Sequence, residues 1–330
     1  MREKPNAIMT QKYSTFGDKL LQHTDVLNSI QNEKEFKPIT VQLCPTEKCD
    51  LNCHYCSVSN RDKTKSISLF TIKKGLRDFK ELGAKALEIS GGGNPLLYPQ
   101  INEVIDFAYE LGYDIGIITN SYKPMNRLTE LSIQQLTWIR ISMSALDFEI
   151  DTFFKLGSIP KEKLGLSYII NKKTTENTIQ RIAHIASRYD VKFVRLAPDC
   201  LNDDSLTINE KWDTIIDKYN QNGKLFIKEI NDNFYPYPTA CYVGMVRPYW
   251  NSSGVYICSS YVLATRNYEP EWKLCEIENI KEFYKEANGK FKAGWMPYDI
   301  NISKCYHCYY YNNNKLLHTV ATELPDRNFA

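Results

Sequence analysis

Residues 39–56 read ITVQLCPTEKCDLNCHYC, an apolar β-branched run followed by the cysteines Cys49, Cys53 and Cys56. The run has the composition of a short buried strand, and the three cysteines after it have the spacing C-x₃-C-x₂-C. A structural zinc site takes four protein ligands in a closed tetrahedron. A [4Fe–4S] cube held by only three cysteines instead leaves one iron open to bind another molecule. The spacing therefore predicts an iron–sulfur cluster with an open iron.

The composition is that of an ordinary globular enzyme. Of the 330 residues, 43% are hydrophobic and 24% are charged, which suits one large domain with a small one, or a single barrel. The formal net charge of +2 gives no long-range field that would attract DNA or RNA. We find no apolar run of the roughly 20 residues that a membrane span needs, and no signal peptide in residues 1–17. Ten cysteines then indicate metal ligands in a reducing compartment, so we expect a cytoplasmic protein.

From Pro38 to about Pro198 the chain alternates short apolar runs with segments of helical periodicity. The expected strands are Ile39–Leu43, Ala86–Ser90, Ile115–Thr119, Trp138–Ser142, Leu164–Ile170 and Lys192–Leu196. Alternating strands and helices with right-handed crossovers build a parallel sheet. Six repeats suit a partial (β/α)6 TIM-type barrel, although an open doubly wound sheet would show the same local pattern. In both folds the chemistry belongs at the carboxyl ends of the strands, where the cysteines leave the first strand.

The pattern changes at both ends of this α/β region. We expect a helical cap over residues 1–37, the barrel over residues 38–235, and a small α+β domain over residues 236–330. The expected buried face of the cap consists of Leu20, Leu21, Val26, Leu27 and Ile30. In the last region we expect a hairpin from Tyr249 to Cys258, followed by a short helix over Ile280–Ala287.

The second expected strand runs into the sequence SGGGNP, residues 90–95. Consecutive glycines after a strand can simply form a tight turn. Together with the cysteine triad, however, this run resembles the Gly-Gly-Glu-Pro element of the radical S-adenosylmethionine (radical SAM) superfamily, with Asn in the place of Glu. In that family the glycine backbone binds the methionine amino group of the cofactor. The cofactor-binding residues that the resemblance implies here are Tyr55, Gly91, Gly92, Gly93 and Asn94.

The fourth expected strand contains Arg140-Ile141-Ser142-Met143-Ser144, which resembles the Arg-x-Ser-x-Asp segment of the same family, with Ser144 in the place of Asp. The resemblance implies that Ser142 and Ser144 meet the ribose or carboxylate of S-adenosylmethionine. Asn120 and Ser121, at the end of the third strand, could do the same. Each of these residues would also be an ordinary polar end to a strand.

Other chemically active residues lie near the predicted site. Cys44 precedes the triad, but the three-cysteine pattern of the family argues against a fourth ligand, and a cysteine packs well as a small core residue. His54 is expected on the loop surface. Cys200, just past the sixth strand, is the one candidate catalytic residue, as a hydrogen-atom donor to a substrate radical.

Four further cysteines, Cys241, Cys258, Cys305 and Cys308, form a possible second metal site. In isolation their layout would also suit a zinc ribbon. With the hairpin and helix around them, they resemble Twitch, the shortened form of the SPASM auxiliary-cluster domain in radical SAM proteins. The resemblance implies a second, auxiliary [4Fe–4S] cluster with no open iron, and leaves Cys275 as a bystander.

The resemblance implies an enzyme of two cofactors. An electron from a reductant such as flavodoxin or ferredoxin reduces the first cluster, which cleaves S-adenosylmethionine to a 5′-deoxyadenosyl radical that abstracts hydrogen from a substrate. We expect a small molecule or nucleotide as substrate, because residues 1–37 are too few for the peptide-recognition domain that many peptide-modifying relatives carry. A ribosomally made peptide is the alternative. A non-catalytic iron–sulfur or zinc module would explain the cysteines but not the glycine run, and oxidation and rearrangement both stay open.

Overall fold

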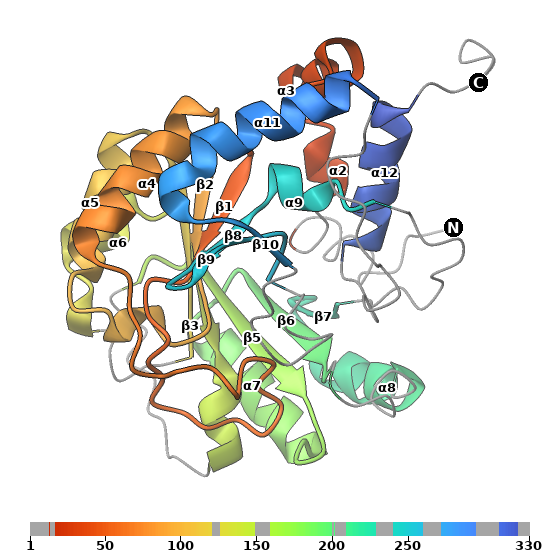
Figure 1. Ribbon diagram of the computed structural model, residues 1–330. Helices are drawn as coiled ribbons and strands as arrows, with labels where there is room; N and C mark the ends of the chain where they lie inside the picture. Colours follow the sequence, from red (N-terminus) through yellow and green to blue (C-terminus); the bar gives the residue numbers. More distant parts are fainter. Residues whose placement is uncertain are drawn as a thin grey trace, which may run out of the picture.

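The computed structural model describes residue 13 and the ranges 17–120, 126–148, 159–199, 201, 209–228, 240–259, 272–294 and 310–322. Within these residues one ten-stranded sheet has the strand order β10-β9-β8-β1-β2-β3-β4-β5-β6-β7 (Figure 1). Strands β1 to β7 are mutually parallel and span Thr40–Leu43, Ala86–Ile89, Asp114–Thr119, Trp138–Ser142, Leu164–Ile170, Phe193–Pro198 and Leu225–Ile227.

The order of these seven strands decides between the two folds that the sequence left open. A doubly wound sheet reverses its strand order at a switch point, whereas β1 to β7 follow one another without reversal. Right-handed crossovers between successive neighbours put all the connecting helices on one face, which gives the partial TIM-type barrel. Figure 1 shows these helices along the outside of the sheet; α4 to α8 span Leu69–Glu81, Ile101–Glu110, Glu130–Gln135, Glu176–Arg188 and Asn209–Tyr219. The short 3₁₀ turns η2 and η4 span Pro95–Leu97 and Met143–Phe148.

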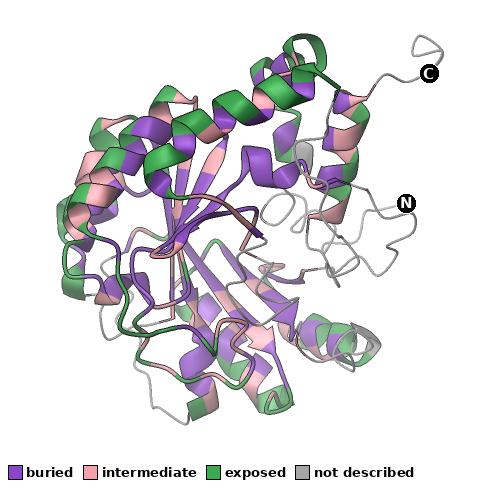
Figure 2. Ribbon diagram, in the orientation of Figure 1, coloured by how far each residue is buried: buried purple, intermediate pink, exposed green. Residues whose placement is uncertain are grey.

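Hydroxyl residues cap the starts of three outer helices. The side chains of Ser68, Thr129 and Thr175 accept hydrogen bonds from backbone N–H groups three residues later in α4, α6 and α7. The apolar positions of these helices face the sheet and their polar positions face outward (Figure 2). Among the described helices, none is both long and apolar enough to cross a membrane.

The two faces of the sheet differ in chemistry. The outer face packs against the helices in the main core, through buried residues that include Val41, Leu43, Leu87, Ile89, Ile115, Ile117, Ile139, Ile141, Leu164 and Leu166. The opposite face, called here the inner face, carries many polar side chains. Neighbouring strands align Gln42 with Glu88 and Ser142 with Ser167, and Arg140 lies in the same set of positions. The interior of the partial barrel is therefore lined with groups that can bind a polar molecule.

The described part of the N-terminal segment, from residue 17, is mostly helical. It forms α2 (Gly17–Leu20), α3 (Thr24–Asn28) and the π-helix η1 (Ser29–Glu33), and α2 and η1 pack against the C-terminal helix α12 (Tyr311–Ala321). Leu20, Val26 and Ile30 are buried. The expectation for Leu21 is wrong, because this residue lies in the turn after α2 and is half exposed.

The expected hairpin is present and continues the sheet of the barrel. Strands β8 (Tyr249–Asn251) and β9 (Gly254–Tyr256) are antiparallel, β10 (Lys273–Cys275) pairs with β9, and β8 lies parallel to β1. The neighbouring helices α9, η7 and α11 span Val243–Val246, Ile277–Asn279 and Ile280–Lys292. Helix α11 extends beyond the expected end at Ala287. The division at residues 37 and 235 stays a prediction.

The six strands expected from the sequence are confirmed, each end within two residues of its expected position. Strands β7 and β10 were not expected, because each has only three residues and neither shows a long apolar run. Strand β7 follows a turn at Gly223, where φ is +62°, and pairs with β6. The sheet therefore extends by one parallel strand beyond the six repeats that the sequence indicates.

Glycine Gly116 lets an aromatic ring lie across the inner face. A Cβ at this position would lie 2.1 Å from Cε2 of Trp138 on the neighbouring strand, so the ring would have to shift. We expect Gly116→Ala to lower the free energy of unfolding by about 1–3 kcal/mol, the usual cost of overpacking. Urea unfolding of the variant and of the wild type measures the difference.

The matched control is Gly289→Ala in helix α11, where no heavy atom lies within 4 Å of the new Cβ. Alanine is the better helix former, so this variant should be more stable than the wild type by up to about 1 kcal/mol. A Gly116→Ala protein of unchanged stability would contradict the packing of Trp138.

Candidate functional site

The three predicted cluster ligands lie on one long loop, residues 44–67, which we call the cysteine loop. It begins at the carboxyl end of β1 and returns to the start of α4. Its two ends are joined to each other, because Ile67 N–H donates to Pro45 O at 2.9 Å and Thr46 forms a β-bridge with Ser66. The loop is thus closed at its base and projects from the edge of the sheet where parallel strands place functional groups.

Within the loop, Cys49, Cys53 and Cys56 are all partly buried. A turn joins the last two, in which Cys56 N–H donates to Cys53 O at 3.1 Å. Two nitrogen donors point at sulfur atoms of the triad: Asn120 Nδ2 lies 3.1 Å from Cys49 Sγ, and Arg61 Nη1 lies 3.5 Å from Cys56 Sγ. Asn120 comes from the end of β3, so the loop lies against the inner edge of the sheet.

These three thiols suit iron–sulfur ligation by their chemistry. In the part of the chain that the structure describes, no three His, Cys, Asp or Glu side chains come close enough together to hold a metal ion. Burial raises the pKa of the Cys53 thiol to about 11, and the neighbouring Cys56 and Cys49 add to the rise. Asn120 and Arg61 nevertheless donate to the sulfur atoms of Cys49 and Cys56. Hydrogen bonds of this kind to the ligand sulfurs tune the reduction potential of an iron–sulfur cluster.

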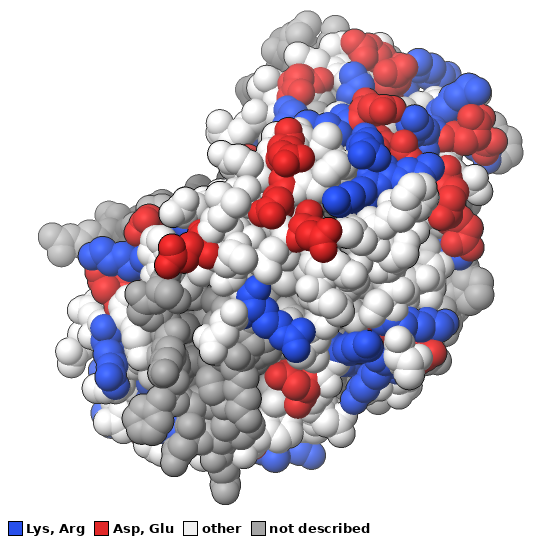
Figure 3. Space-filling view, turned by 90° about the vertical axis from the view of Figure 1, so that its left-hand side faces the viewer, with Lys and Arg blue, Asp and Glu red and all other residues white. Residues whose placement is uncertain are grey.

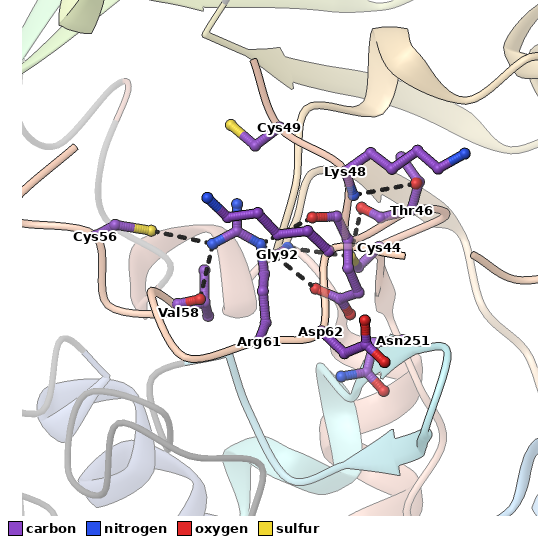
Figure 4. Close-up of polar contacts among 12 residues, drawn as sticks. Cys44, Thr46, Lys48, Cys49, Cys56, Val58, Arg61, Asp62, Gly92 and Asn251 are labelled. Atoms are coloured by element: carbon purple, nitrogen blue, oxygen red, sulfur yellow. Dashed lines mark hydrogen bonds and ion pairs between the residues drawn. The ribbon is translucent and has the colours of Figure 1, made fainter. Parts of the chain in front are cut away.

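Arginine Arg61 fixes the shape of the cysteine loop from inside (Figure 4). Its guanidinium donates to Glu47 O at 2.9 Å and to Val58 O at 2.7 Å, besides its contact with Cys56. Its Nε also lies 3.9 Å from the Glu47 carboxylate, and both side chains are only 2% exposed. Arg61 therefore connects the start of the loop, at Glu47, with the turn that carries Cys56. The sequence provided no basis for predicting this role, because a single arginine in a polar loop belongs to no motif or periodic pattern.

Cys44 is fully buried below the loop, as expected for a small core residue. Its Sγ accepts a hydrogen bond from Gly92 N–H at 3.0 Å and donates to Thr46 O at 3.4 Å. Burial, and then the charge of Glu47, raises the pKa of the thiol to about 12. Cys44 is therefore a neutral thiol that joins the cysteine loop to the glycine run on the next strand.

Two glycines of residues 91–93 are required by close packing. A Cβ on Gly93 would lie 2.1 Å from Lys48 O, and one on Gly91 would lie 2.8 Å from Cys44 Sγ. None of the three glycines has a positive φ. Glycine is therefore not needed here for a turn in the left-handed region of backbone conformation. The backbone of the glycine run instead lies directly against the start of the cysteine loop.

Asn94 is the central hydrogen-bonding residue beside this contact. Only 1% exposed, it donates from Nδ2 to Asp50 Oδ1 at 3.1 Å. Its Oδ1 accepts from Thr119 Oγ1 at 2.8 Å and from Leu96 N–H at 3.2 Å. The side chain therefore connects the cysteine loop, the end of β3 and the start of η2. A glutamate would lack the amide donor that reaches Asp50.

A second group of polar residues follows β4. The hydroxyls of Ser142 and Ser144 lie 2.7 Å apart and share one hydrogen bond. The buried hydroxyl of Tyr55 lies beside Ser144 and Asp147. Burial raises the pKa of Tyr55, and Cys53 beside it adds to the rise. The end of β4 and the start of η4 thus bring Ser142 and Ser144 together, with Ser144 beside the cysteine loop, and their contact with the cofactor stays a prediction.

Sequence reasoning missed Asp147 in this group. The carboxylate accepts from Tyr168 Oη at 2.5 Å and from Asn171 Nδ2 at 3.0 Å. It lies on η4, three residues after Ser144, where the available signal was an acidic residue close behind a polar strand end. The expectation for His54 is confirmed, since this residue lies exposed on the loop.

Of the remaining predicted site residues, the structure describes some and not others. Ser121, Cys200, Cys305 and Cys308 lie outside the described residues. Cys241 and Cys258 both pack against one apolar group, which consists of Cys44, Tyr249, Tyr256, Ile257 and Trp272. Cys275 lies on β10, and burial raises the pKa of its thiol to about 12. The auxiliary cluster and the role of Cys200 therefore stay predictions.

Comparison with known proteins supplies the family. The sequence model of the Radical SAM superfamily matches residues 43–202, which begin at the end of β1 and include the cysteine loop and the glycine run. A probable GTP 3′,8-cyclase of Archaeoglobus fulgidus is 32% identical over 110 residues, 33% of this chain and 36% of that protein. The subtilosin biosynthesis protein AlbA of Bacillus subtilis is 23% identical over 153 residues, 46% of this chain and 34% of that protein.

The fold is shared with solved radical SAM enzymes. The crystal structure of Streptococcus suis SuiB bound to its precursor peptide SuiA has a TM-score of 0.56 and 15% identity, and covers 89% of this chain and 75% of SuiB. The chain spans only about a third to a half of the length of the first curated relatives it matches. The match to the family model and the shared fold agree with the placement of the site: residues 43–202 of this chain are a radical SAM domain.

Proposed function

We propose that this chain binds a [4Fe–4S] cluster through Cys49, Cys53 and Cys56 and uses it to cleave S-adenosylmethionine reductively. Membership of the family implies both cofactors. The observation that carries the ligand assignment is the closed cysteine loop, in which three thiols lie at the carboxyl edge of the sheet while Cys44 is engaged elsewhere. A cube held by these three residues keeps one iron open for the cofactor.

We assign different parts of the cofactor site to different residues around the cysteine loop. The cluster and S-adenosylmethionine, when bound, would supply a 5′-deoxyadenosyl radical that abstracts a hydrogen atom from a C–H bond. Gly91, Gly92 and Gly93 let their backbone approach the methionine end without a side chain in the way. Asn94 supports this run, although its own side chain is occupied by Asp50 and Thr119. The apolar packing beneath the edge limits the access of water, which protects a reactive radical.

The other side of the proposed cofactor site comes from β3 and β4. Asn120 donates to Cys49 Sγ and so helps to orient that ligand. Ser142 and Ser144 present hydroxyls to the ribose or carboxylate of the cofactor, and Tyr55 packs beside them. Cys200 is proposed as a hydrogen-atom donor to the substrate radical, and Cys241, Cys258, Cys305 and Cys308 as the ligands of an auxiliary [4Fe–4S] cluster.

For the substrate we propose a small molecule or nucleotide, oxidised or rearranged after hydrogen abstraction. Relatives named as GTP 3′,8-cyclases support this choice, since their substrate is a nucleotide. The alternative is a ribosomally made peptide, favoured by AlbA, which is named for bacteriocin biosynthesis, and by SuiB, which was solved with a precursor peptide. A one-electron reductant such as flavodoxin or ferredoxin would complete the reaction in the cytoplasm. A non-catalytic metal-binding module would not need the close contact of Gly93 with Lys48.

Cys53→Ala should abolish the formation of 5′-deoxyadenosine from S-adenosylmethionine under strong reductant, because loss of one thiolate removes the cluster that performs the cleavage. Chromatographic assay of 5′-deoxyadenosine in anaerobically reconstituted protein measures the effect. The matched control is Cys44→Ser, which keeps a group able to accept from Gly92 N–H and should retain the cluster. Cleavage above the no-enzyme background in Cys53→Ala, or loss of the cluster in Cys44→Ser, would show that the ligand set is different.

The whole chain should carry two cubes and therefore about eight irons after anaerobic reconstitution, four per cluster. Iron and sulfide analysis with Mössbauer spectroscopy gives the count and the cluster type. Replacement of Cys49, Cys53 and Cys56 together should leave about four irons. Zinc in the C-terminal site of protein purified without oxygen would refute the auxiliary cluster while leaving the first cluster intact.

A further inference from the structure

Four charged residues meet on the inner face of the barrel, away from the cysteine loop. Arg140 lies on β4, Arg195 on β6, and Arg247 shortly before β8. Glu88 on β2 is the carboxylate within electrostatic reach of all three. We call this group the inner-face charge cluster. It contains three cations and one anion.

Among the described residues, Glu88 forms its close ion pair with Arg247. Arg247 Nη2 lies 3.0 Å from Glu88 Oε1, and its Nη1 donates to Gln42 Oε1 and to Tyr310 Oη, both at 2.9 Å. Burial opposes charge on Glu88, but Arg247 first, and then Arg140 and Arg195, hold the pKa of this carboxyl below its ordinary value. Arg247 and Glu88 thus form a satisfied ion pair between the C-terminal segment and the barrel.

Arg140 forms no ion pair within the described residues, and the attraction of Glu88 reaches it only from further away. Its Nε is shielded from solvent and has no hydrogen-bond partner there, and its guanidinium lies 5.8 Å from the centre of the Trp138 ring. Burial, and then the charge of Arg195, lowers the pKa of Arg140 to about 9. The pKa of Arg247 is raised instead, through Tyr310 and Glu88, although its burial acts in the opposite direction. The pKa of Arg247, which is ion-paired with Glu88, is therefore raised, whereas that of Arg140, which has no ion pair, is lowered.

A partly buried guanidinium without an ion pair is costly, because desolvation and the repulsion of the neighbouring Arg195 both oppose its charge. A folded protein keeps such a group where a ligand of opposite charge completes it. The planar, forked donors of arginine match the oxygen atoms of phosphate and carboxylate. The aromatic rings around this region give a low-polarity wall, which strengthens the attraction for an anion.

Building on the proposed function, we propose that Arg140, with Arg195 beside it, binds the anionic group of the substrate, a phosphate or a carboxylate. Arg195 is the register partner of Ser167, which pairs with Ser142 on β4. Both arginines therefore belong to the same stretch of inner face as the serines proposed to meet the cofactor. The position also selects for size, since the anion would be held inside the barrel.

The register of the strands gives the depth of this anion site. Arg140 pairs with Ile118, and Asn120, whose Nδ2 contacts Cys49 Sγ, lies two residues further along β3. Two strand residues span about 7 Å, so the charge cluster lies about that far below the level of Cys49. A substrate bound through its anion would extend toward the cysteine loop. The carbon that loses hydrogen would then lie a few bonds from the phosphate or carboxylate.

The test measures anion binding to cluster-loaded protein at constant ionic strength, with inorganic phosphate and succinate as probes. Calorimetric titration of the wild type should show saturable binding of at least one probe, and the tighter probe identifies the anion. Arg140→Gln should weaken that binding at least tenfold, because the neutral amide keeps the approximate size but loses the charge. The matched control is Arg181→Gln on the exposed side of α7, which should bind as the wild type does. Wild type that binds neither probe, or Arg140→Gln that binds equally well, would overturn the proposal.

The thermal midpoint of the same samples separates a binding role from a structural one. Without an anion, Arg140→Gln should melt at the wild-type temperature or above it, because the change removes a partly buried charge that has no ion pair and is repelled by Arg195. A lower midpoint together with wild-type anion affinity would assign Arg140 to the fold alone and refute the proposal.

A third measurement keeps this proposal distinct from the proposed function. Arg140→Gln should still bind S-adenosylmethionine and still form 5′-deoxyadenosine under strong reductant without substrate. Loss of cofactor binding with unchanged anion affinity would mean that Arg140 serves the cofactor, which overturns the anion site and leaves the radical SAM activity standing. If the wild type forms no 5′-deoxyadenosine but binds the probes through Arg140, the proposed function fails and the anion site remains.

Discussion

The glycine run lies directly against the start of the cysteine loop, through the backbone at Gly93 and through the Cys44 side chain at Gly91 and Gly92, and the arrangement of the candidate site depends on this contact. It requires glycine at residues 91 and 93, because a Cβ would meet Cys44 Sγ or Lys48 O. It also requires a small buried hydrogen-bonding atom beneath, which Cys44 supplies to Gly92 N–H. Adjacent strands fix both partners, since Leu43 and Ile89 are register neighbours at the ends of β1 and β2. The cysteine loop is thereby held at the ends of two paired strands.

The sheet separates two kinds of interaction. Apolar burial acts on the outer face, where helices and strands share one core, so stability does not depend on filling the inner face with apolar side chains. The inner face can then carry charges such as Arg140 and Glu88. On the surface drawn in Figure 3, cations and anions lie interspersed, and the net charge of +2 is small. The concentration of like charge in the inner-face charge cluster is therefore local and does not follow from the overall composition.

The sequence predicted those features that have a local cause. Strands β4 and β5 have the expected ends because their apolar, β-branched composition repeats over five or more residues, and the cysteine spacing marked the loop. The order of the strands, and so the barrel, needed the pairing of distant segments. Arg61 and Asp147 were missed because their importance comes from contacts with Glu47, Tyr168 and Asn171, none of which a spacing pattern records. Leu21 was misplaced because a turn ends α2 one residue too early for a helical face.

The hairpin beside β1 has a consequence for the order in which the protein can be assembled. Arg247 reaches Gln42 across 205 residues of chain, and β8 covers the edge of β1 that β2 leaves free. During synthesis β1, which leads into the cysteine loop, is complete long before β8 exists, and Glu88 is made long before its ion-pair partner Arg247. Contacts so distant in sequence form late, since closing the intervening chain costs entropy first. The pairing of β8 with β1 and the contacts of Arg247 with the barrel can therefore form only after residues 247–251 have been synthesised.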